Sequence, residues 1–138
     1  MRAIKKIIIH STATPEGRHH TAADVCRWHR ERGWKKIGYH CLIQLDGTVE
    51  KARNMAKAGA HVAGHNANSI GIAYVGGTDA NLQPKDTRTR EQRMALKTLV
   101  CELMVQFPDA QVLGHRDLAN TACPSFDVKK EFEEWSFG

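Results

Sequence analysis

Three consecutive isoleucines, Ile7, Ile8 and Ile9, run directly into His10 near the start of this chain. Residues 4–9 are apolar without regular alternation, which predicts a strand buried on both faces. Polar residues at the carboxyl ends of strands meet at one edge of an open α/β sheet, where such sheets place their sites. The run therefore predicts a central strand and, in His10, a first candidate site residue.

The rest of the chain alternates helical and extended patterns. Helices are expected at 21–32, at 89–107 and from Asp127 onward, and strands at 4–9, 37–45, 48–52, 70–75 and 111–113. The first two helices begin with capping boxes, and Asp46-Gly47 predicts a two-residue hairpin turn between two strands. The order β-α-β-β-β-α-β-α predicts a single α/β domain over residues 1–138. A central mixed sheet is expected, flanked by helices, with an active-site cleft at one sheet edge.

A second histidine, His115, follows the last expected strand, and Cys123 lies farther along the same polar loop, just before Pro124. Together with His10 they offer two imidazoles and one thiolate. Three such ligands suit a catalytic zinc ion, which keeps its fourth position open for water. Spacing alone leaves open a simpler interpretation, two loop histidines and a buried thiol.

Tyr39 and His40 are neighbours on an expected strand, so their side chains should point to opposite faces. The Tyr39 hydroxyl could donate a hydrogen bond to an oxyanion in a reaction beside the metal. The alternative is a half-buried tyrosine that only packs. His40 is interpreted as a histidine with satisfied nitrogens on the second face.

The segment 58–69 is expected to be a long polar loop next to a strand. Such a loop suits the rim of a site that binds a polar polymer, or it is simply solvated. Its hydrogen-bonding side chains are His61, His65, Asn66, Asn68 and Ser69. Asp117 either orients a metal ligand from outside or caps a turn, and the sequence favours neither.

The chain carries a formal net charge of +5 and has a sequence pI of about 9.2. A basic surface favours anionic partners, namely bacterial wall polymer, nucleic acid or an anionic membrane. No dense Lys/Arg run with interleaved aromatic residues is present, so no nucleic-acid partner is expected. No apolar run approaches the ~20 residues that span a bilayer, so no membrane insertion is expected. The N-terminus lacks a signal-peptide pattern, which predicts synthesis in the cytoplasm without a signal peptide.

The other three cysteines, Cys26, Cys41 and Cys101, each lie beside apolar residues. They are expected to be buried, reduced and structurally passive.

Seven motifs in order resemble the zinc-dependent N-acetylmuramoyl-L-alanine amidases of the type-2 amidase and peptidoglycan-recognition superfamily, in particular the small phage amidase-type lysozymes. The motifs occupy residues 8–14, 28–34, 37–40, 45–49, 59–72, 114–117 and 122–127. Only the 78–88 loop has no counterpart. The resemblance therefore covers nearly the whole chain.

The resemblance implies that His10, His115 and Cys123 bind Zn2+ and that Tyr39 assists at the zinc-bound water or at the scissile carbonyl. A second catalytic position maps to Thr121, where phage-type members have lysine and animal amidases of the superfamily have threonine. His61 maps to the substrate-cleft loop, with Asn66 and Asn68 as further expected substrate contacts. Receptors of the superfamily that bind peptidoglycan without cleaving it lack the cysteine, so Cys123 favours an enzyme.

The implied reaction is hydrolysis of the amide between N-acetylmuramic acid and L-alanine in peptidoglycan. The alternative is a non-catalytic peptidoglycan-binding module that uses the same cleft. Peptidoglycan or muropeptides are the expected partners and a monomer is the expected state. The protein would act on the cell wall after phage or prophage release or other export, or on cytoplasmic muropeptides.

Overall fold

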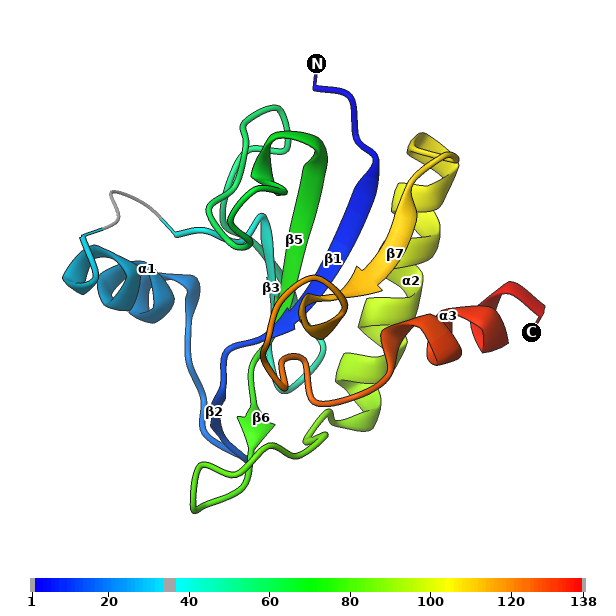
Figure 1. The fold of residues 1–138 in the computed structure, drawn as a ribbon. Coiled ribbons are helices and arrows are strands. Elements are labelled where there is room, and N and C mark those ends of the chain that lie inside the picture. Colours follow the sequence, from blue (N-terminus) through cyan, green and yellow to red (C-terminus); the bar gives the residue numbers. More distant parts are fainter. Residues whose placement is uncertain (1, 34–36, 138) are drawn as a thin grey trace.

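The computed structural model describes residues 2–33 and 37–137 and contains a five-stranded sheet in the order β4-β3-β5-β1-β7 (Figure 1). The strands are β1 (Lys6–Ser11), β3 (Cys41–Ile43), β4 (Val49–Lys51), β5 (Ser69–Tyr74) and β7 (Gln111–Gly114). β3, β5, β1 and β7 are parallel, while β4 pairs with β3 in the antiparallel direction. The expected mixed sheet is confirmed, and the isoleucine run lies at its centre.

Three α-helices accompany the sheet, α1 (Ala22–Glu31), α2 (Arg90–Gln106) and α3 (Val128–Phe137). Both expected capping boxes are present, at Thr21 for α1 and at Thr89 for α2. Asp127 accepts a hydrogen bond from the backbone N–H of Lys130, so it caps α3 as expected. Among the helices that the structure describes, none is long and apolar enough to cross a membrane.

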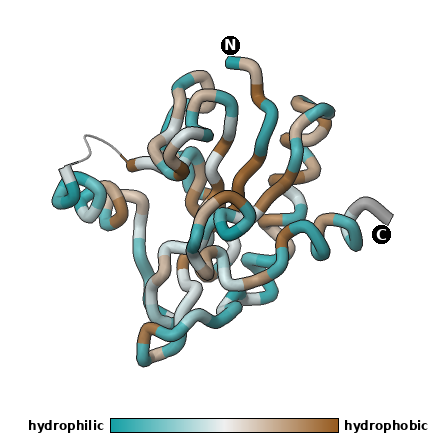
Figure 2. Tube along the Cα trace, in the orientation of Figure 1, coloured by the Kyte–Doolittle hydropathy of each residue, from teal (hydrophilic) through white to brown (hydrophobic). Residues whose placement is uncertain are grey.

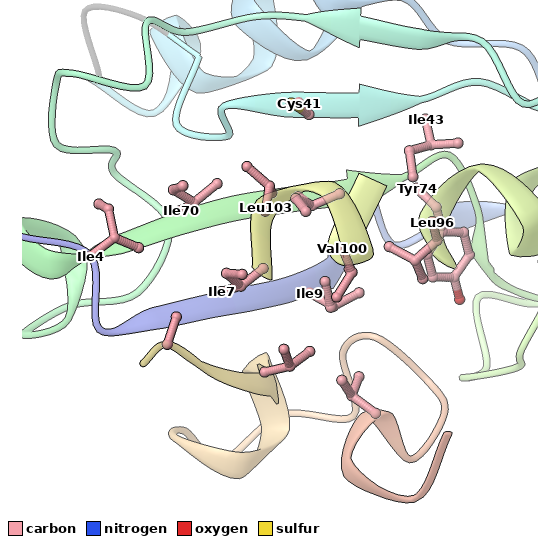
Figure 3. Packing of buried hydrophobic residues seen from close by; sticks show 14 of the residues in the cluster. Ile4, Ile7, Ile9, Cys41, Ile43, Ile70, Tyr74, Leu96, Val100 and Leu103 are labelled. Atoms are coloured by element: carbon pink, nitrogen blue, oxygen red, sulfur yellow. The ribbon is translucent and has the colours of Figure 1, made fainter. Parts of the chain in front are cut away.

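The larger apolar core lies between the sheet and the helices α2 and α3. In Figure 3, Ile7 and Ile9 of β1 point toward Leu96, Val100 and Leu103 of α2. A smaller cluster on the opposite face packs Val25 of α1 against β3 and β5. Figure 2 shows the same distribution along the chain, with hydrophobic residues gathered in the central strands. The sheet is therefore covered on both faces, but more thickly on the α2 side.

Two short strands, β2 (Thr14–Pro15) and β6 (Gly77–Thr78), form a separate small parallel sheet. These strands were not expected, because Pro15 and the glycines at 76 and 77 predict loops. Two short 3₁₀ helices, η1 (Asn66–Asn68) and η2 (His115–Asp117), complete the described elements.

The hairpin between β3 and β4 differs from the expectation. Gln44 and Thr48 are hydrogen-bonded across a loop of three residues, and only Gly47 among them has a positive φ, of 88°. A type I turn followed by a left-handed residue gives this three-residue hairpin, whereas a two-residue turn needs a primed turn type. A side chain at Gly47 would also meet the Glu91 carbonyl, at 2.8 Å from the added Cβ. The two-residue prediction is wrong because Leu45 also belongs to the loop and the positive φ falls on its last residue, Gly47.

Two further local predictions are corrected. β3 begins at Cys41, so Tyr39 and His40 precede the strand rather than lie on it. Cys101 is exposed and Cys26 is half-buried, and only Cys41 of the three is buried. Cys101 follows the buried Val100 by one residue, about 100° around the helix, so it turns away from the sheet. Trp34, part of one motif above, lies outside the described residues.

Candidate metal centre and active site

His10, His115 and Cys123 form one cluster, with one potential ligand atom from each within 4.8 Å of the others. The Nδ1 atom of His10 lies 3.9 Å from Sγ of Cys123. Tetrahedral coordination with ordinary Zn–N and Zn–S bond lengths would place such a pair about 3.6 Å apart. The three residues that the spacing singled out are therefore close enough to share a metal ion.

The register of the parallel strands brings the two histidines together. β1 pairs with β7 so that Ile9 lies opposite Gly114, and His10 and His115 are the next residues along the chain from this pair. Their ring centroids are 4.6 Å apart. His10 lies near the end of β1 and His115 directly follows β7, so the cluster lies at the carboxyl ends of these two strands, where a site was expected. Asp117 accepts a hydrogen bond from the Gly114 N–H at 2.8 Å, so it caps the turn that carries His115.

The loop with Cys123 folds back onto the end of β1. The Cys123 carbonyl accepts a hydrogen bond from the Arg116 N–H at 2.8 Å. The backbone N–H of Ser11 donates to Sγ of Cys123 at 3.2 Å. These hydrogen bonds fix the thiol beside His10. Ser11 was not singled out from the sequence, because its backbone donor leaves no compositional signal.

Burial sets the protonation of the three groups. Desolvation lowers the pKa of His10 well below its ordinary value, helped by the nearby His61 and His115, and it also lowers the pKa of His115. Desolvation raises the pKa of the Cys123 thiol, against the hydrogen bonds from Ser11. Both imidazoles are therefore neutral and have a lone pair to offer. The thiol needs a neighbouring cation to ionise.

Tyr39 stands beside this cluster. Its ring centroid is 5.0 Å from that of His10, and the side chain is half-buried. Burial raises its pKa, and Cys123 in its ionised form acts in the same direction. The hydroxyl consequently stays protonated, as a hydrogen-bond donor must.

Thr121 is exposed in the loop before Cys123. Its Oγ1 accepts a hydrogen bond from the Cys123 N–H at 3.3 Å. The side chain thus supports the turn that presents the thiol.

The loop that contains His61 and Asn66 packs against the buried side of His10. Nδ1 of His61 lies 2.8 Å from Nε2 of His10, and His61 is only 9% exposed. The Asn66 side-chain oxygen accepts hydrogen bonds from the backbone N–H groups of His61 and Val62. Asn68 is half-buried in η1. The contact between His61 and His10 has no spacing signal in the sequence, because it depends on how this loop folds over β5.

His40 is fully buried, and its two ring nitrogens lie within hydrogen-bond distance of the Gly71 N–H and the Lys57 carbonyl. The expectation of a satisfied histidine is confirmed. A cavity of about 600 Å3 lies between β4 and α2 and is lined partly by Leu99 and Leu103. That cavity is next to the apolar α2 side and does not contain the metal-ligand cluster.

Comparison with known proteins gives results in agreement with this geometry. The family model described as N-acetylmuramoyl-L-alanine amidase matches residues 1–126. The endolysin of Klebsiella phage KP32 is 41% identical over 129 residues, covering 94% of this chain and 85% of that protein.

Two solved structures extend the comparison to the fold. The N-acetylmuramoyl-L-alanine amidase LysC from Clostridium intestinale superposes with a TM-score of 0.81 at 29% identity, covering 99% of this chain and 85% of LysC. A Drosophila PGRP-LB variant in complex with tracheal cytotoxin gives 0.79 at 27% identity, with 98% and 83% covered. The chain therefore belongs to the N-acetylmuramoyl-L-alanine amidase family of the type-2 class.

Proposed function

We propose that this protein is a zinc-dependent amidase that cleaves the bond between N-acetylmuramic acid and L-alanine in peptidoglycan. The observation that carries the proposal is the cluster of His10, His115 and Cys123 with Tyr39 beside it. The family match and the endolysin relatives support amide hydrolysis in the cell wall. The presence of all three ligands favours an enzyme over a module that only binds.

The donor set fits zinc. Two neutral imidazoles and a thiolate, with ligand atoms within 4.8 Å of one another, match the three-ligand sites of catalytic zinc. Bound there, Zn2+ would polarise the scissile carbonyl and lower the pKa of a coordinated water toward ~7.

The protein's own side chains supply the rest of the chemistry. Tyr39 remains a donor because burial raises its pKa, so its hydroxyl stabilises the negative charge that develops on the carbonyl oxygen. Thr121 supports the Cys123 turn and offers its hydroxyl proton as a second, neutral donor. It brings no positive charge, unlike the lysine expected at this position in phage-type relatives.

The loop of His61, Asn66 and Asn68 is proposed to form one wall of the substrate cleft, and Asp117 to hold the His115 turn from behind. We further propose that the protein acts as a monomer. The basic net charge favours attraction to the anionic wall polymer. Synthesis in the cytoplasm, with later access to the wall or to free muropeptides, completes the proposal.

Turnover of a defined muropeptide tests it. Purified protein should release a free L-alanine amino group from N-acetylmuramoyl-peptide, lose this activity after chelation, and regain it when one equivalent of zinc is added. Binding of peptidoglycan without any release of amino groups would contradict the proposal and indicate a wall-binding module.

A further inference from the structure

His61 lies behind the metal-ligand cluster, in a continuous chain of polar atoms that links His10 to Ser69. Nε2 of His10 lies 2.8 Å from Nδ1 of His61, and Nε2 of His61 lies 3.1 Å from Oγ of Ser69. Ser69 is fully buried, and His10 and His61 are nearly so. Both ring nitrogens of His61 thus have partners inside the protein.

The ring of His61 fits into a space that is free only because two neighbouring residues are glycines. A Cβ added at Gly71 of β5 would lie 2.8 Å from the ring, and one added at Gly59 would lie 2.6 Å from its Cδ2 atom. Real Cβ atoms do not approach so closely, so the ring fits only because both positions lack side chains. Asn66 holds the backbone of His61 from the other side through its side-chain oxygen. The ring position is therefore determined by the fold, before any metal or substrate binds.

The direction of the hydrogen bonds among His10, His61 and Ser69 follows from which nitrogen of His10 faces the metal position. Nδ1 of His10 faces Sγ of Cys123, so this nitrogen must keep its lone pair for the metal and the proton must be on Nε2. Nε2–H of His10 then donates to Nδ1 of His61. His61 in turn carries its proton on Nε2 and donates it to Ser69. One proton per ring satisfies every nitrogen in the chain.

We infer that His61 is a positioning residue for the metal site: it accepts the Nε2 proton of His10 and so fixes the tautomer and the ring orientation in which Nδ1 binds the metal. This inference rests on the proposed zinc site. Outer partners of metal-binding histidines are usually carboxylates, carbonyls or water, and their removal typically costs about 10–100-fold in metal affinity. A neutral histidine, kept in one tautomer by Ser69, takes that place here.

A matched pair of variants separates the hydrogen bond from packing. Asn and Leu have nearly the same shape, and both leave the same space where the imidazole was, but only Asn can present an acceptor toward His10. We expect His61→Leu to bind zinc about 10–100-fold more weakly than wild type, and His61→Asn to stay within about threefold of it. The dissociation constants are measured by competition with a chromophoric chelator, together with thermal unfolding of the metal-free proteins.

His40→Asn is the control, because His40 is also a buried histidine and its ring centroid is 6.0 Å from that of His61. It should lower stability and leave zinc affinity unchanged. Equal zinc affinities for the Leu and Asn variants would overturn the role of His61 while leaving the zinc site intact. A wild-type protein that binds no zinc would overturn the proposed function itself, and the inference with it.

A measurement on the unaltered protein covers the case in which a variant does not fold. Nitrogen-15 NMR of the zinc-loaded wild type distinguishes imidazole tautomers. We expect His61 with its proton on Nε2, and a proton on Nδ1 instead would refute the inference.

Discussion

On the α2 side of the sheet, Ile7 and Ile9 of β1 enter a continuous apolar layer, whereas His10, the next residue, faces buried polar side chains on the other side. The apolar layer is held by close packing, in which each lost methyl group weakens the fold. On the other side, His61 and Ser69 are buried as well. Burying such groups costs free energy unless each polar atom has a partner.

The two faces should therefore respond differently to substitution. Changes among the histidines, Tyr39 and Cys123 should alter metal binding or turnover, while changes in the apolar layer should alter the free energy of unfolding. One strand supplies both faces, so β1 is where this separation can be tested most directly.

The largest effect is expected for Cys123→Ser. Serine is a poor zinc ligand compared with a thiolate, so zinc binding should be largely lost and activity should fall by more than the ~10–100-fold typical of an outer partner. Metal analysis and muropeptide turnover measure both. Cys101→Ser makes the same chemical change at an exposed position of α2 and should alter neither. Full retention of zinc and activity in Cys123→Ser would exclude the ligand assignment.

Tyr39→Phe comes next. It removes one hydroxyl and keeps the ring that packs beside His10. Loss of one oxyanion donor typically lowers kcat by about 10²–10³-fold, with zinc content and unfolding temperature unchanged. Steady-state kinetics measure kcat, metal analysis measures the zinc content, and thermal unfolding gives the unfolding temperature. Near wild-type turnover would reduce Tyr39 to a packing residue on the α1 side.

Most of the fold could be predicted from local patterns. The isoleucine run, both capping boxes and the terminal cap at Asp127 all appear where the sequence places them. The length of the β3–β4 hairpin loop and the exposure of Cys101 were predicted wrongly. The hairpin has three loop residues with a positive φ at the last of them, Gly47, and Cys101 is exposed because it lies one 100° step around α2 from the buried Val100.

For the candidate site, the proximity of the two histidines was predictable, but the contacts around them were not. His10 and His115 could be paired because His10 ends an apolar strand pattern and His115 follows another, and the register of β1 and β7 brings them together. The contacts behind these two histidines could not be predicted. The space for the His61 ring depends on Gly59 and Gly71, which come together only in the folded protein. The N–H donor of Ser11 belongs to the backbone and leaves no trace in residue type.

Thr121→Val should have a smaller effect than Tyr39→Phe. It deletes a hydroxyl that accepts a hydrogen bond from the Cys123 N–H, at little change in volume. A single hydrogen bond is worth about 0.5–1.5 kcal/mol, so kcat should fall by roughly two- to tenfold with zinc retained. Thr121→Ser keeps the hydroxyl and serves as the control. If the valine variant matches wild type in steady-state turnover, the hydroxyl contributes nothing and zinc with Tyr39 carries the reaction.

The smallest effect on activity is expected for Ile9→Val, which probes the apolar side of β1 immediately before His10. Ile9 has no exposed surface and contacts the α2 layer, so removing one methyl should lower the free energy of unfolding by about 0.5–1.5 kcal/mol. Because its side chain points away from the metal-ligand cluster, kcat and zinc affinity should remain at wild-type values. Urea unfolding of the metal-free protein and steady-state turnover of the zinc-loaded protein measure the two quantities. A loss of turnover in parallel with the loss of stability would show that packing on one face adjusts His10 on the other, and that the two sides of β1 are coupled through the strand.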